Sequence, residues 1–90
     1  MNTFHLKVSS PDGNIFDGNI VKFDVRGVEG DLAVMAGHVP FVTSVVKGVC
    51  TVWLDEDTKK TATSEGGLLT VDKDLVTYIS GTFKFDEEKA

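Results

Sequence analysis

The chain has 90 residues, of which 41% are hydrophobic and 26% are charged, values that are ordinary for one small globular domain. Fourteen Asp and Glu residues outnumber nine Lys and Arg residues, so the formal net charge is −5. This acidic balance argues against binding to nucleic acid, whose phosphates would repel the chain, and against direct docking on an anionic membrane surface.

The N-terminal part alternates apolar and polar residues with a period of two, which predicts strands with one apolar face. Residues 4–8 (FHLKV) and residues 21–25 (VKFDV) both follow this pattern. Between them, the sequence PDGN at residues 11–14 predicts a turn. A short strand is expected around Ile15 and Phe16.

The C-terminal half continues the same pattern. Residues 50–54 (CTVWL) predict a strand, and residues 55–60 (DEDTKK) should close a hairpin onto residues 61–65. Gly66 and Gly67 predict a bulge or corner. After them we expect a strand at residues 68–71, a turn at residues 72–74, and a last strand or pair of strands within residues 75–85.

The whole chain therefore favours strands over helices, because β-branched residues fill the segments between closely spaced turn residues. We predict an all-β fold, an antiparallel β-sandwich or flattened barrel of about eight to ten short strands. Residues 1–85 form this single domain. Residues 86–90 are an acidic tail that is too short for a stable helix of its own.

No catalytic, cofactor or metal site is predicted. A phosphate-binding Gly-Lys-Ser/Thr motif is missing, and a calcium loop starting at Asp12 would have Phe16 and Phe23 at ligand positions. His5, His38 and Cys50 are too far apart in sequence to form a spaced ligand pair. Cys50 lies on the apolar side of its strand, which indicates a small buried residue and not a nucleophile.

The sequence also bears on location. A single cysteine forms no internal disulfide, and the first ten residues contain no continuous apolar segment typical of a secretion signal. No apolar run approaches the roughly 20 residues of a membrane helix. We expect a cytosolic protein that does not insert into a membrane directly.

Lys73 suggests one alternative function. It is flanked by Asp72 and Asp74 at an expected hairpin tip, which is how small acidic β-domains present a lysine that carries a lipoyl group. An ordinary charged turn has the same composition. A lipoyl-type carrier domain modified at Lys73 therefore stays open as a second hypothesis.

Residues 27–48 (GVEGDLAVMAGHVPFVTSVVKG) combine glycines, acids, a histidine and many apolar side chains. Phe41 and Val45 are expected to face the core, which leaves Val39 and Val42 on the outside. An exposed apolar strip on a small domain indicates contact with another protein. The alternative is a strand that is buried on both faces.

This segment resembles the epsilon subunit of F-type ATP synthases, in which a Gly-x-Glu-Gly-acid stretch precedes a Gly-His-x-Pro corner. The opening FHLKVSSPDGNIFDGNIVKFDV, the later SEGGLLTV and the closing VTYIS are similar to the same family in the same order. The resemblance covers nearly all of residues 3–80. Ala33 and Ala36 depart from it, since relatives often carry Gly and Pro there.

The resemblance implies a non-enzymatic rotor subunit with no cofactor, whose β-sandwich joins the gamma subunit to the ring of membrane c subunits. It would act at the cytoplasmic face of the bacterial plasma membrane, held there by the complex. Glu29 and Asp31 would face the polar loops of the c-ring. The residues implied to contact the gamma subunit are Ser10, His38, Val39, Pro40, Val42, Thr43 and Val49.

The family's usual members continue into a two-helix C-terminal arm, which binds ATP in some relatives and inhibits hydrolysis in some. By this resemblance, residues 86–90 correspond to the place where such an arm begins.

Overall fold

The structure is a computed structural model that describes residues 2–37 and 39–86. All regular elements in these residues are strands, which confirms the predicted all-β class and the expected strand number. The eight strands are β1 (Phe4–Ser10), β2 (Gly13–Ile20), β3 (Lys22–Gly27), β4 (Gly30–Met35), β5 (Phe41–Trp53), β6 (Lys59–Val71), β7 (Leu75–Ile79) and β8 (Lys84–Phe85).

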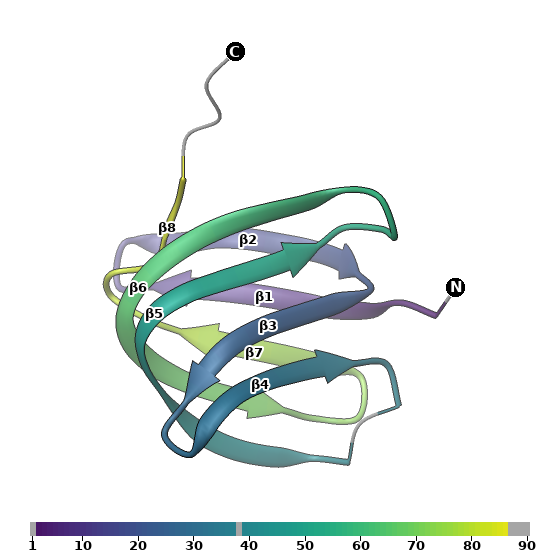
Figure 1. Cartoon of the computed structure of the whole chain (residues 1–90), viewed down its shortest axis with the longest axis horizontal. Coiled ribbons are helices and arrows are strands. Elements are labelled where there is room, and N and C mark those ends of the chain that lie inside the picture. The colour runs from purple at the N-terminus through teal and green to yellow at the C-terminus, as the bar shows by residue number, and fades with distance from the viewer. Residues whose placement is uncertain (1, 38, 87–90) are drawn as a thin grey trace.

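The strands form one sheet that folds over a single core. Their order is β2-β1-β7-β6-β5-β3-β4, with β8 paired to β6. β5 and β6 are 13 residues long and bend together at the left of Figure 1, so each strand contributes to two layers. The first layer contains β2, β1, β7, the C-terminal half of β6 and the N-terminal half of β5. The second layer contains the other halves of β6 and β5, followed by β3 and β4.

The predicted antiparallel pairing holds for all strand pairs except one. β1 and β7 run parallel, with His5 opposite Leu75 and Ser9 opposite Ile79. A period of two in hydrophobicity shows that a segment is a strand, but it carries no information on the direction of the neighbouring strand.

The hairpin between β1 and β2 turns at Pro11 and Asp12, within the predicted turn. The short strand expected around Ile15 and Phe16 is longer, because β2 continues through Gly18 to Ile20. The Phe16 ring lies over Gly18, where an added Cβ would be 3.5 Å from the ring atom Cζ. A Cβ at this position would thus be in ordinary van der Waals contact with the ring.

The corner predicted at Gly66 and Gly67 is a bend inside a continuous strand. The pairing of β6 with β5 keeps one register across it, so it contains no bulge. Gly66 has a φ of 132°, a conformation that residues with a Cβ rarely adopt. The side-chain alternation changes phase at this point: Ala62 and Ser64 are buried before it, and Leu69 and Val71 are buried after it.

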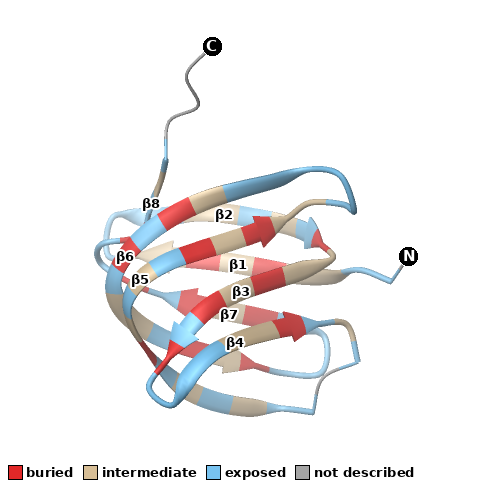
Figure 2. Ribbon diagram, in the orientation of Figure 1, coloured by how far each residue is buried: buried red, intermediate tan, exposed pale blue. Residues whose placement is uncertain are grey.

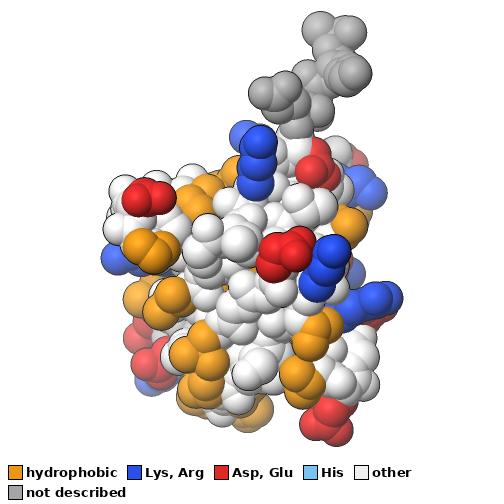
Figure 3. Space-filling model, turned by 90° about the vertical axis from the view of Figure 1, so that its left-hand side faces the viewer, with side chains coloured by type: hydrophobic (Ala, Val, Ile, Leu, Met, Phe, Trp, Pro, Cys, Tyr) orange, Lys and Arg blue, Asp and Glu red, His pale blue; other side chains and the backbone are white. Residues whose placement is uncertain are grey.

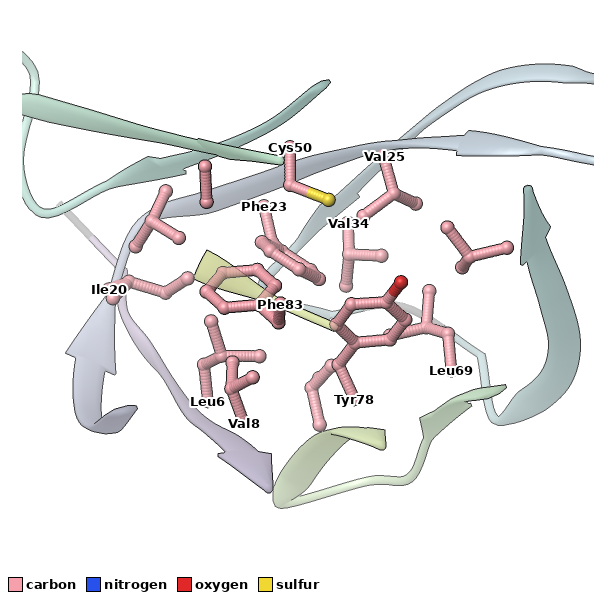
Figure 4. Close-up of a cluster of buried hydrophobic side chains, with 14 of the residues drawn as sticks. Leu6, Val8, Ile20, Phe23, Val25, Val34, Cys50, Leu69, Tyr78 and Phe83 are labelled. Atoms are coloured by element: carbon pink, nitrogen blue, oxygen red, sulfur yellow. The ribbon is translucent and has the colours of Figure 1, made fainter. Parts of the chain in front are cut away.

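The core contains hydrophobic residues from both layers, and buried positions alternate with exposed ones along the strands (Figure 2). Its largest fully buried side chains are Tyr78 and Phe23. Figure 4 shows their rings near the middle of the cluster, with centroids 5.9 Å apart. Phe83 packs edge-on against Tyr78 at 5.8 Å, which brings the segment after β7 into the core.

Hydrogen bonds inside the core attach the bend of β6 to β7 and the residues after it. The hydroxyl groups of Tyr78 and Ser64 are 2.6 Å apart. Ser80 Oγ donates to the carbonyl oxygen of Gly66 over 2.7 Å, and Thr82 N donates to Ser80 Oγ. Because buried polar groups are costly unless they are paired, this arrangement favours one geometry of the bend.

Burial raises the pKa of Cys50 and of Tyr78 above their ordinary values of 9.0 and 10.0, and in each case a hydrogen bond with Ser64 opposes the shift. The folded chain then holds these protons more tightly than the unfolded chain does. We therefore expect the free energy of unfolding to keep its full value below about pH 9 and to fall at higher pH.

Urea unfolding at about pH 7 and about pH 10.5 measures this loss. Cys50→Ala should lose less stability over the same range, because its thiol no longer titrates. Equal losses in the two proteins would contradict the role of Cys50.

Candidate interaction surface

Residues 27–48 form the hairpin between β3 and β4, the connection to β5, and the N-terminal part of β5. As predicted, Val45 faces the core and is 4% exposed, and Phe41 packs against the core. Val39 and Val42 are 74% and 61% exposed. The alternative of a strand buried on both faces is therefore wrong.

The outer face of the first layer continues this apolar surface across β6 and β7. Leu68 is 43% exposed and Ile79 is 49% exposed, and these two residues lie opposite each other in the sheet. Val42 is diagonal to Leu68, because Ser44 pairs with Leu68 and Val42 with Thr70. We call Val42, Leu68 and Ile79 the outer strip.

Figure 3 faces the bend of β5 and β6 and shows exposed hydrophobic side chains gathered in the lower half of the view. The sequence reasoning missed Leu68 and Ile79. The sequence contained an indication of them. Leu68 is next to the buried Leu69, and Ile79 is next to the buried Tyr78, so each strand is apolar on both of its faces here.

The structure does not place Val49 with the outer strip. Val49 is 58% exposed on the second layer, because β5 changes phase at the bend. It borders a shallow hollow of about 570 Å³ that is also lined by Arg26 and Asp31. Arg26 lies across Gly48, where a Cβ would be 3.4 Å from Arg26 Cβ. Arg26 Nε is 3.6 Å from Asp31 Oδ1, so Val49 lies near one of the acids predicted for the c-ring.

Glu29 lies in the turn between β3 and β4, and Asp31 follows in β4 with an 85% exposed side chain. A second hollow of about 320 Å³ separates this hairpin from the N-terminal part of β5. Val28, Glu29, Asp31, Val42 and Thr43 border it, and we call it the hairpin hollow. Val42 and Thr43, which were predicted to contact the gamma subunit, thus border the same hollow as the two acids that were predicted to contact the c-ring.

Three further residues were predicted to contact the gamma subunit, namely Ser10, Pro40 and His38. Ser10 ends β1, where its Oγ donates to the Gly13 carbonyl and accepts a bond from the Asp12 N–H, so it stabilises the turn. Pro40 is exposed immediately before β5. His38 lies outside the described residues.

The residues considered above for lipoyl attachment, nucleophilic catalysis or metal binding lie in ordinary turn, core and surface positions. Lys73 lies in the turn between β6 and β7, where its N–H donates to Asp72 Oδ1 over 2.7 Å. Cys50 is 2% exposed, and the His5 ring is paired with the Asp17 carboxylate. A cluster of three or more His, Cys, Asp or Glu side chains able to hold a metal does not occur among residues 2–37 and 39–86. None of these residues belongs to a helix long and apolar enough to cross a membrane.

Comparison with known proteins identifies the family. The sequence profile described as "ATP synthase, Delta/Epsilon chain, beta-sandwich domain" matches residues 3–85. The chain belongs to this family. The matched residues include those of the outer strip and of the hairpin hollow.

Two relatives are similar along most of the chain. The sodium ion specific ATP synthase epsilon chain of Acetobacterium woodii is 34% identical over 86 residues, which are 96% of this chain and 65% of the relative. The ATP synthase epsilon chain of Afipia carboxidovorans is 40% identical over 82 residues, 91% of this chain and 60% of the relative. The chain thus spans less than two thirds of the length of either relative, and its predicted resemblance to epsilon subunits is confirmed.

Solved structures support the same fold. A chain of the Euglena gracilis mitochondrial ATP synthase, in a structure of OSCP, F1 and c-ring, gives a TM-score of 0.85 at 21% identity over 92% of this chain and 53% of that chain. A chain from the central stalk and c-ring of the Tetrahymena thermophila enzyme gives 0.77 at 10% identity over 92% of this chain and 66% of that chain. Epsilon chains are structural and not catalytic subunits, in agreement with the prediction of a non-enzyme.

Proposed function

We propose that the chain is a non-catalytic subunit of the central stalk of an F-type ATP synthase. It links the gamma subunit to the ring of c subunits and thereby couples ion-driven rotation to ATP synthesis or hydrolysis. The observation that carries this proposal is the family match over residues 3–85. The chain is then a peripheral membrane protein, held by the complex at the cytoplasmic face of the bacterial plasma membrane.

The surface supports two contacts of different chemistry. The outer strip offers exposed apolar side chains on a stiff sheet, which suits a protein interface that buries them. We assign it to the gamma subunit. Glu29 and Asp31 offer exposed carboxylates at the β3–β4 hairpin, which suit the basic side chains of polar c-ring loops.

The first experiment is size-exclusion chromatography of the chain with its cognate gamma subunit, with intact mass measured on the same sample. We expect one-to-one co-elution and an unmodified mass. The absence of a complex together with added mass on Lys73 would instead support the lipoyl carrier. The family match already favours the stalk function, because it runs through the turn that contains Lys73.

Asp31→Arg should weaken the attachment to the c-ring by roughly tenfold, because it reverses an exposed charge and places a second cation beside Arg26. The measurement is retention of the chain on the purified gamma and c-ring assembly at low and high salt. Glu56→Arg is the matched control, since it makes the same charge change in the exposed β5–β6 hairpin. Equal retention of the two variants would count against a ring contact at Asp31.

A further inference from the structure

The path of the sheet ends in the edge strands β2 and β4, and the two-residue strand β8 adds a short edge beside β6; of the two longer edges, β2 is the protected one. The pairing of β2 with β1 contains a register shift between Val8 and Ser9, which interrupts the regular ladder. The Phe16 ring of β2 also packs against Phe85 of β8, with centroids 6.0 Å apart. Irregular pairing is a common way to prevent another strand from pairing with an edge, whereas the Phe16–Phe85 contact lies on the core face of β2 and leaves its edge as it is.

β4 has no such irregularity. It pairs with β3 without a register shift from Gly27 opposite Gly30 to Lys22 opposite Met35. Its sequence, GDLAVM, contains no proline and no lysine, the residues that most often block an edge. Among the described residues, β3 is its sole partner strand, and β4 is the last strand of its layer in Figure 1.

The register decides which backbone groups of β4 are available. Gly27 and Gly30 flank a two-residue turn and form the first pair of the ladder, so they exchange both of their hydrogen bonds. Bonded pairs then recur at every second residue, at Leu32 and Val34. The N–H and C=O groups of Asp31 and Ala33 consequently point away from β3, towards the free edge, and those of Met35 do so where the end of β4 lies beside the β6–β7 turn.

The surroundings of this edge indicate what it binds. The first half of β4 borders the hairpin hollow, where Val28 and Val42 are each 61% exposed. Glu29 and Asp31 border the same hollow, and none of the described residues that line it is basic. The edge therefore offers backbone hydrogen bonds, apolar contact and negative charge within one short stretch.

We propose that an extended segment of a partner subunit pairs with the free edge of β4 as an added strand. The segment carries an apolar side chain into the hairpin hollow and a lysine or arginine that meets Glu29 or Asp31. A second copy of the chain is a poorer occupant, because it would bring another net charge of −5 and a second acidic hairpin. The inference rests on the proposed function in one respect, that the partner belongs to the ATP synthase.

Hydrogen–deuterium exchange tests the backbone pairing directly. The unchanged chain is compared alone and assembled with its cognate gamma subunit and c-ring, and the peptide covering residues 30–36 is followed. We expect exchange in this peptide to slow by roughly tenfold or more on assembly, because the outward amides of Asp31 and Ala33 gain acceptors. A chain that assembles while this peptide exchanges as fast as before would overturn the inference and leave the proposed function standing.

Ala33→Pro provides the second test, because proline removes an outward N–H and leaves the bonds to β3 in place. Ala33→Val is the matched control, since it keeps the N–H and favours a strand. We expect Ala33→Pro to weaken assembly by roughly tenfold relative to Ala33→Val, with both variants folded by circular dichroism. Equal assembly of the two variants would overturn the added strand. A dimer of the isolated chain in which β4 is protected would overturn its assignment to a partner subunit.

Failure of the unchanged chain to enter the complex would overturn the proposed function and this inference together. The two failures are thus distinguishable.

Discussion

Replacing Gly67 by alanine is expected to lower the free energy of unfolding by about 2–4 kcal/mol, which is large for the addition of one methyl group. A Cβ at this position would collide with the carbonyl oxygen of Ile79. It would also lie 2.9 Å from Tyr78 Cε1 and 3.0 Å from Ser80 Cβ. A backbone oxygen of a paired strand cannot move alone, so relief of the collision requires β7 to move away from β6.

Urea unfolding of the unchanged chain and of Gly67→Ala measures this effect. Gly81→Ala is the matched control, because a Cβ there has no heavy atom within 4 Å and the glycine is not in the left-handed region. We expect the control to change the free energy of unfolding by about 0.5 kcal/mol or less. Similar values for the two variants would show that β6 and β7 separate easily at the bend.

Much of the fold could be predicted from local patterns. The alternation in β1 and β3 identified their buried residues, and the turns at residues 11–14 and 72–74 were placed by Pro, Asp and Gly. The parallel pairing of β1 with β7 could not be predicted, because it joins strands that are far apart in the sequence. The phase change in β6 was also hidden, because it depends on the φ of Gly66 and not on hydrophobicity.

The change of side-chain alternation at the bend also explains which surface residues were predicted correctly. Val42 was correctly placed outside, because it precedes the bend and keeps the simple alternation of its strand. Val49 lies beyond the bend, and its side chain is on the second layer, near Arg26 and Asp31. Leu68 and Ile79 join Val42 only through the order of β5, β6 and β7 in the sheet, which one sequence does not reveal.

The bend thus connects the core to the proposed function. Ser64 and Ser80 hold β6 and the end of β7 together at the same place where the two strands present Leu68 and Ile79 outwards. A contact surface of this kind needs little ordering when a partner binds, because its strands are already fixed by the core. A stiff sheet also suits a subunit that transmits rotation.

Val42→Asp should have the largest effect on assembly of the surface changes discussed. It places a charge at the β5 end of the outer strip, where a bound gamma subunit would exclude water from it. We expect affinity for the gamma subunit to fall roughly 30-fold, or about 2 kcal/mol. The stability of the isolated chain should hardly change, because Val42 is 61% exposed.

The binding of Val42→Asp to the gamma subunit is measured by titration and compared with two other variants. Val42→Thr keeps the shape of the side chain and should lose much less affinity. Asn19→Asp adds the same charge at an exposed position of β2, opposite His5, and should bind like the unchanged chain. If Asn19→Asp weakens binding as much as Val42→Asp does, the gamma subunit responds to net charge and the outer strip is not its contact. If only Val42→Asp weakens binding, desolvation of the strip is the cause, and the apolar face formed by β5, β6 and β7 is the part of the domain that the gamma subunit covers.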